Sequence, residues 1–181
     1  MSSDSGPMKT SPADLQRKGV PLWEQIVAGG LFTGLAPIAS GTVASAVALL
    51  FYVFIPGFGH PLVLLGTAAV AIGVGFPLAR RIEEKIGPDP SFFTLDEFAG
   101  QWIALASPFV PHDPVWAIIA FLCFRVFDIA KTWPASWFDR QGGGLGIMGD
   151  DVVAALYANI CAHFIWFGLS LLGIVSEFLG S

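Results

Sequence analysis

The sequence predicts an all-α, polytopic integral membrane bundle, and three features of the chain support this fold class. Only 13% of the 181 residues are charged, whereas a soluble domain usually carries about 25%. Hydrophobic residues make up 54% of the chain, and its mean hydropathy is +0.68. Several apolar runs also approach the roughly 20 residues with which a helix crosses a membrane. We therefore expect one compact domain of helices in a bilayer.

The N-terminal twenty residues differ from the rest of the chain. They are rich in Ser, Pro and charge, and they lack the apolar segment of a cleaved signal peptide. We expect a disordered cytoplasmic tail over residues 1–20 and a membrane domain over residues 21–181. The two cysteines, Cys123 and Cys161, lie in apolar segments without metal-ligand spacing, so we expect packed thiols.

The first part of the membrane domain is divided by glycine and proline. Residues 23–39 contain three glycines and one proline, which predicts a broken, interfacial or re-entrant helix. A second helix is predicted over residues 42–55, with Ser40 or Thr42 available as its N-cap. The sequence PGFGHP at residues 56–61 predicts a turn.

Two further apolar helices are predicted on either side of a polar loop. Residues 62–79 are apolar and close to the length that crosses a ~30 Å hydrocarbon core. Residues 80–91 are polar and include Gly-Pro-Asp-Pro, which predicts a loop. Residues 92–110 are apolar again, but they carry Asp96 and Glu97 near the start of the predicted helix.

The C-terminal part of the chain contains the longest apolar run. A tight connection at residues 111–114 is followed by a predicted helix over residues 115–130, which carries Arg125 and Asp128 near its C-terminal end. Residues 151–179 form the longest apolar segment and the clearest membrane span.

The basic residues predict the orientation of these helices. All nine Lys and Arg lie before the first helix, in the loop after residue 79, or between residues 124 and 151. The positive-inside rule places these segments in the cytoplasm and the two proline-rich turns outside. This orientation brings nine ionisable residues to one membrane face: Asp96, Glu97, Arg125, Asp128, Lys131, Asp139, Arg140, Asp150 and Asp151. No basic patch of the kind that binds nucleic acid is present in the sequence.

The central region combines these charges with a glycine-rich segment. Residues 141–149 contain five glycines, and we expect a loop whose backbone N–H groups can approach an anion. No Gly-Lys-Ser/Thr follows, so the segment is not a Walker A loop. Arg125, Asp128 and Lys131 are spaced three residues apart and can share one helix face. We therefore expect an active-site loop at the cytoplasmic face of the bundle.

The excess of carboxylates at this face favours a metal ion. Six acids accompany three bases there, and two like charges 4 Å apart repel by roughly 1 kcal/mol in water and about 4 kcal/mol near a protein surface. Carboxylates without Cys or His favour Mg²⁺ over Zn²⁺. Arg and Lys beside a Mg²⁺ site suit a phosphate group. The residues thus predict metal-assisted phosphate chemistry.

Simpler explanations account for single residues of this cluster. Asp150 or Asp151 alone could cap the last helix, and Arg125 with Asp128 could form a structural ion pair. The two tryptophans of the central region are expected to be interfacial anchors. The three histidines lie outside the cluster and are not expected to be ligands. None of these explanations accounts for the excess of acids as a whole.

Three sequence blocks resemble the phosphatidylglycerophosphatase A family: GLAPIASGT at residues 34–42, LDEFAGQWIAL at 95–105, and FRVFDIAKTWPASWFDR with GGLGIMGDD at 124–151. Their order and spacing match, and the resemblance extends from about residue 23 to the C-terminus. The chain differs at Ser40 and Thr132, where the family commonly has proline, which concerns turn rigidity rather than charge. The resemblance implies a Mg²⁺-dependent enzyme of the bacterial inner membrane that removes the terminal phosphate from phosphatidylglycerophosphate and leaves phosphatidylglycerol.

The charges and the resemblance together give the expected roles. Metal ligands are expected among Asp96, Glu97, Asp128, Asp150 and Asp151. The phosphate group is expected to bind Arg125, Lys131, Arg140 and Thr42. The candidates for catalysis are Asp96, Asp128, Asp139 and Asp151, in a hydrolysis in which Mg²⁺ positions a water for in-line attack. The expected partners are the lipid substrate and the surrounding membrane lipids.

The alternative function is a small membrane channel or carrier for Mg²⁺ or protons, because intramembrane carboxylates are usual there too. Transport needs acids throughout the membrane depth, whereas these acids gather at one interface. Covalent phosphatase routes lack their motifs, since there is no D-x-D-x-T/V, no Cys-x5-Arg and no histidine in the cluster. A CDP-alcohol phosphatidyltransferase would need D-G-x2-A-R followed by D-x3-D, which is absent.

Overall fold

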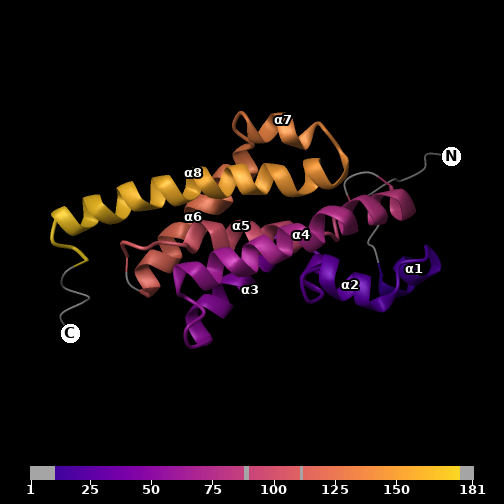
Figure 1. Cartoon of the computed structure of the whole chain (residues 1–181), viewed down its shortest axis with the longest axis horizontal. Coiled ribbons are helices and arrows are strands. Elements are labelled where there is room, and N and C mark those ends of the chain that lie inside the picture. Colours follow the sequence, from indigo (N-terminus) through magenta and orange to yellow (C-terminus); the bar gives the residue numbers. More distant parts are fainter. Residues whose placement is uncertain (1–10, 88–89, 111, 176–181) are drawn as a thin grey trace.

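The computed structural model describes residues 11–87, 90–110 and 112–175, and these residues are helical without any strand (Figure 1). The predicted all-α class is therefore confirmed. The elements are α1 (Pro12–Arg17), α2 (Leu22–Ala28), the 3₁₀ helix η1 (Thr33–Leu35), α3 (Ser40–Phe54), α4 (Pro61–Ile86), α5 (Leu95–Leu105), α6 (Pro114–Ala130), α7 (Ala135–Asp139) and α8 (Gly143–Leu171). By length and composition, α4 and α8 could cross a membrane.

Helix α5 occupies the centre of the bundle, where α3, α4, α6 and α8 surround it (Figure 1). The apolar helix predicted over residues 92–110 is thus shorter than expected. Its eleven residues span about 16 Å, too little to cross a membrane. The apolar pattern of this segment reflects burial by other helices, because eight of the eleven residues are buried.

Neighbouring helices satisfy the carbonyl groups at the buried end of α5. Asn159 Nδ2 of α8 donates to the carbonyl oxygens of Ile103 and Ala106 at 3.2 and 2.8 Å. Trp116 Nε1 of α6 donates to the carbonyl oxygen of Leu105 at 2.9 Å. A helix can end inside the protein when its last carbonyls find such partners, so these contacts fix the position of α5.

Helix α4 is longer than the sequence suggested. Residues 80–86 were predicted to form a loop, but they continue the helix to Ile86. The reason is that Ile82 is buried on the same face as earlier core residues of α4. Arg81 and Lys85 also pair with the buried Glu24 of α2 at 3.0 and 2.7 Å. Pro88 and Asp89 lie outside the described residues.

Helix α8 begins within the glycine-rich segment, so the loop predicted over residues 141–149 is wrong. From Gly143 onward the segment is helical. A side chain at Gly144 would collide with the backbone carbonyl of Phe76 in α4. The glycine therefore serves the close approach of two helices. The helix ends at Leu171, earlier than residue 179, and residues 176–181 lie outside the described part of the chain.

The start of the predicted membrane domain is interrupted as expected, because α2 and η1 replace one continuous helix over residues 23–39. The predicted N-cap of the next helix is wrong. Helix α3 begins at Ser40 behind Ala39, which has a left-handed φ of +50° and provides no side-chain cap. Ser40 Oγ instead donates to the carbonyl oxygen of Ser91 at 3.2 Å, which ties α3 to the segment before α5.

Part of the predicted disordered tail is helical. Residues 1–10 lie outside the described residues, but α1 follows directly, with Ser11 as its N-cap accepting from the Asp14 backbone N–H at 3.2 Å. Leu15 of α1 is fully buried. The packing of one leucine thus orders the end of the segment. Both cysteines are free, and Cys123 is buried as expected.

Candidate functional site

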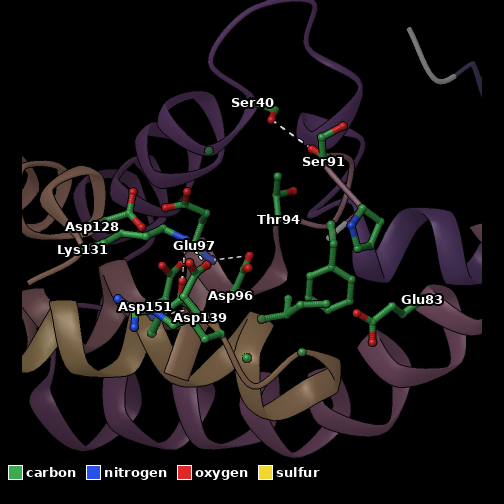
Figure 2. Close-up of a pocket in the computed structure, with 18 residues that line it drawn as sticks. Ser40, Glu83, Ser91, Thr94, Asp96, Glu97, Asp128, Lys131, Asp139 and Asp151 are labelled. Atoms are coloured by element: carbon green, nitrogen blue, oxygen red, sulfur yellow. Dashed lines mark hydrogen bonds and ion pairs between the residues drawn. The ribbon is translucent and has the colours of Figure 1, made fainter. Parts of the chain in front are cut away.

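A polar pocket of about 490 Å³ lies at one end of the bundle (Figure 2). It is formed where α3, α5 and α8 begin and where α4 and α6 end, with α7 beside them. Its lining residues are Ser40, Gly41, Glu83, Pro90, Ser91, Phe93, Thr94, Asp96, Glu97, Asp128, Lys131, Asp139, Arg140, Gly142, Gly146, Ile147, Asp150 and Asp151. Of the nine ionisable residues expected to meet at one face, eight line this pocket. The ninth, Arg125, contacts two of them.

Three carboxylates converge in the pocket from three different helices. Glu97 of α5, Asp128 of α6 and Asp151 of α8 each offer one oxygen, and these oxygens lie within 4.8 Å of one another. Asp151 is buried, and its Oδ2 has no hydrogen-bond partner in the part of the chain that the structure describes. A buried charged oxygen without a partner is costly, and a divalent cation would satisfy it. Carboxylate oxygens are the donors that hard cations such as Mg²⁺ and Ca²⁺ prefer, so the trio fits such an ion.

Arg125 lies behind this trio and does not line the pocket. Its guanidinium pairs with Glu97 and, at 2.9 Å, with Asp128 Oδ2. Ser45 of α3 is fully buried, and its hydroxyl lies 2.9 Å from Glu97 Oε2 and 3.2 Å from Arg125 Nη1. The structure therefore places Arg125 where it orients two carboxylates. It does not place Arg125 where it would face a phosphate.

Gly41 allows the Glu97 carboxylate to take this position. A methyl group added at Gly41 would overlap Glu97 Oε1 and come within 3.4 Å of Arg125 Nη2. Sequence reasoning did not single out Gly41 or Ser45. Gly41 lies in the first of the family-like blocks, beside Thr42, and that block was the available signal.

The environment of the pocket opposes negative charge on its acids. Burial and the nearby negative charge of Asp128 raise the pKa of Glu97 to about 7, although Arg125 and the Ser45 hydrogen bond act in the opposite direction. Burial and the charge of Glu97 raise the pKa of Asp96 well above its usual range. Such groups become neutral by binding a proton or are stabilised by a cation.

Lys131 organises a second group of acids. It terminates α6, and its Nζ pairs with Asp139 of α7 and, at 3.1 Å, with Asp150 Oδ2 of α8. Partial burial alone would lower the pKa of Lys131, but the two carboxylates outweigh it and raise that pKa. Asp150 is thus neutralised by Lys131, apart from the carboxylate trio. Arg140 also lines the pocket and has no ion-pair partner among the described residues.

Glu83 is a pocket residue that sequence reasoning missed. It lies across the pocket from the acids of α5, α6 and α8 (Figure 2). It was missed because residues 80–91 were predicted to be a loop, whereas residues 80–86 extend α4 to the pocket. With Glu83, seven carboxylates accompany Arg125, Lys131 and Arg140, so the formal excess is four negative charges. The negative charge that a bound cation would offset is therefore larger than the sequence indicated.

The structure also shows where the acids at the start of α8, Thr42 and the histidines lie relative to the pocket. Asp150 and Asp151 lie two turns inside α8, whose N-cap is Gly142, so the prediction that one of them caps the helix is wrong. Thr42 belongs to the first turn of α3 but does not line the pocket. The histidines lie outside the site as expected; His163 Nε2, for example, is 2.8 Å from Ser107 Oγ.

Comparisons with known proteins identify the family of this chain. The sequence model of the phosphatidylglycerophosphatase A family matches residues 26–166. Phosphatidylglycerophosphatase A of Escherichia coli (strain K12) is 35% identical over 145 residues, which are 77% of this chain and 81% of that protein. The Haemophilus influenzae protein of the same name is 36% identical over 139 residues, or 75% of this chain and 83% of that protein.

A third relative carries a different name. A Bacteroides thetaiotaomicron protein, named as a candidate phosphatidylinositol-3-phosphatase, is 32% identical over 142 residues, which are 75% of this chain and 88% of that protein. No solved structure matches the chain significantly. Proteins of this kind are thus named for at least two lipid phosphates.

Proposed function

The chain belongs to the phosphatidylglycerophosphatase A family and is a phosphatase, and on this premise we propose that it hydrolyses phosphatidylglycerophosphate to phosphatidylglycerol and inorganic phosphate. The observation that carries the proposal is the meeting of a carboxylate trio with the cations Lys131 and Arg140 in one pocket. Two relatives are named for this activity. A phosphate monoester is the group that such a combination of acids and bases suits.

The metal proposed for the site is Mg²⁺, held by Glu97, Asp128 and Asp151. When bound, it would polarise a phosphoryl oxygen and offset the repulsion between the carboxylates and the phosphate. Arg125 and Ser45 act as positioning residues, since they hold Glu97 and Asp128 in place. Asp150 is proposed to act on Lys131 in place of the ligand role expected from the sequence.

Lys131 and Arg140 are proposed to bind the phosphoryl oxygens. Lys131 keeps its positive charge at neutral pH because Asp139 and Asp150 raise its pKa. Arg140 can form two parallel hydrogen bonds with a phosphate. Asp96 lines the pocket without a cation partner among the described residues. Burial raises its pKa, which makes its carboxylate form a stronger base, and that carboxylate form is proposed to accept a proton from the attacking water.

The proposed setting is the bacterial inner membrane, with several helices crossing it and the pocket at the cytoplasmic face. The helices α4 and α8 support this, as do large apolar side chains that remain exposed on the bundle, such as Leu62, Phe164 and Leu171. Arg80 and Arg81 lie at the pocket end of α4, and the positive-inside rule assigns that end to the cytoplasm.

The carrier alternative is less well supported. A transport path needs ionisable groups along the membrane depth, but in the described part of α3 to α8 the acids gather at the pocket end, apart from Asp113 at the other end. Liposomes containing the purified protein separate the two functions. Flux of Mg²⁺ or protons without phosphate release would favour a carrier.

The proposal is tested by incubating purified protein with phosphatidylglycerophosphate in vesicles and measuring the released phosphate. We expect release with Mg²⁺ and none after chelation. Phosphatidylinositol 3-phosphate in identical vesicles is the matched substrate control. Faster release from that lipid would overturn the proposed substrate, and equal release after chelation would overturn the metal dependence.

A further inference from the structure

A second cavity, an apolar groove of about 380 Å³, runs along the side of α4 against α5 and α2. Gly66, Val70 and Val74 of α4 form one wall, and Leu95 and Trp102 of α5 form the other. A side chain added at Gly66 would meet no atom of the described residues within 4 Å, so this end of the groove is open toward them.

The described residues that line the groove offer no polar group to a ligand. Thr67 lines it, but its hydroxyl donates within the helix to the carbonyl oxygen of Val63 at 2.8 Å. Trp102 turns its Nε1 toward α3 and donates to the carbonyl oxygen of Ala48 at 3.2 Å. Methyl groups and an aromatic ring face the groove. Contact with hydrocarbon is therefore more favourable there than contact with water.

The groove is aligned with the polar pocket. Leu95 of the groove directly precedes Asp96 of the pocket at the start of α5. On α4, Val74 lies nine residues before Glu83, which corresponds to about 14 Å along the helix axis. A ligand that fills both sites therefore has a charged end and a hydrocarbon chain that runs along α4.

We propose that the groove holds one acyl chain of the phospholipid whose phosphate enters the pocket. The inference rests on the proposed function, because it assumes a lipid substrate. In a bilayer the chain is already surrounded by hydrocarbon, so the groove adds little affinity. Its contribution is to place the headgroup, and a misplacement of about 1 Å can cost 10²-fold in rate.

The experiment fills the groove and compares two substrates. Val70→Trp places an indole in it, and Leu65→Trp is the matched control, since Leu65 lies five residues earlier and about 140° around the same helix. Both positions are exposed, Val70 by 67% and Leu65 by 46%, so both variants are expected to fold. The substrates are diacyl phosphatidylglycerophosphate in vesicles and its deacylated headgroup, glycerophosphoglycerophosphate, in solution.

The ratio of the two hydrolysis rates is the readout. We expect the ratio of diacyl to deacylated kcat/KM to fall about tenfold in Val70→Trp and to remain at the wild-type value in Leu65→Trp. Gly66→Leu, which enters open space, is expected to lower the ratio by a smaller factor. An unchanged ratio in both groove variants overturns the inference.

A binding measurement gives an answer independent of turnover. A diazirine on one acyl chain of phosphatidylglycerophosphate is expected to label residues 66–74 of α4 in the wild-type protein and in Leu65→Trp. The label should be lost in Val70→Trp. Labelling of α8 in place of α4 overturns the groove assignment. If the wild-type protein hydrolyses neither substrate, the proposed function itself fails.

Discussion

Replacement of Asp151 by asparagine tests the metal site most directly, because the change preserves shape and removes one charge. Asp151 is 4% exposed and its oxygen lies within 4.8 Å of oxygens of Glu97 and Asp128. Two full charges at that distance repel by roughly 3 kcal/mol at an effective dielectric constant of about 20. Proton binding relieves part of this repulsion, as the raised pKa of Glu97 indicates. We therefore expect about 1 kcal/mol of stabilisation in the metal-free variant.

Thermal unfolding with and without Mg²⁺ is the assay. With chelator present, the variant should unfold about 2–4 °C above the wild-type protein, the shift expected for roughly 1 kcal/mol in a chain of this size. With Mg²⁺ at about 100 times its dissociation constant, the wild-type protein should gain about 2.7 kcal/mol. The variant should gain little, and its phosphate release should fall by about 10²-fold or more.

Asp150→Asn is the matched control. Asp150 is the neighbour of Asp151 in the sequence, but it pairs with Lys131 and is not one of the three converging carboxylates. This variant should lose stability in chelator and keep its Mg²⁺-dependent gain. If Mg²⁺ stabilises Asp151→Asn as much as the wild-type protein, the assignment of the trio as the metal site is wrong.

Four further outcomes are expected. Gly41→Ala should lower phosphate release and Mg²⁺ affinity about tenfold or more, because the added methyl overlaps Glu97 Oε1; titration with Mg²⁺ measures this. Ser45→Ala should destabilise the protein by about 1–3 kcal/mol, since buried polar groups lose a partner, as denaturant unfolding would show. Arg140→Ala should leave the free energy of unfolding unchanged, because Arg140 has no ion-pair partner among the described residues. The same variant should reduce kcat/KM by about 10²-fold. Mg²⁺ affinity should rise as the pH increases through about 7, because below that pH the cation must displace the proton that Glu97 binds. Calorimetric titration at pH 6, 7 and 8 measures this, and a flat profile would contradict it.

The meeting of charges at one end of the bundle could be predicted from the sequence. The distribution of basic residues led to this expectation, and the structure brings eight of the nine charged residues to the lining of one pocket. Asp96, Asp128 and Asp151 therefore line one pocket although they lie on three different helices. Nothing in the sequence alone distinguished the trio that converges from the acids that pair with Lys131, because that depends on side-chain directions.

The errors share a physical cause. Composition does not distinguish an apolar segment buried by other helices from one that faces lipid, so α5 was predicted too long. Glycines that permit close approach, such as Gly144 against Phe76, resemble glycines that make a loop. Glu83 was missed for a related reason: the polar end of α4 looked like a connection, although Ile82 shows that one face of it is buried.

The central position of α5 has a consequence for how bilayer thickness would act on this protein in the membrane setting proposed above. A thicker or thinner bilayer changes the tilt of helices that meet lipid along their length, and α4 and α8 are long enough to respond. Helix α5 contacts α3, α4, α6 and α8 and carries Glu97, whereas Asp151 of the same carboxylate trio belongs to α8. In the membrane setting proposed above, hydrophobic mismatch that tilts α8 should therefore move Asp151 relative to Glu97, and so change the cleavage step as well as the access of lipid.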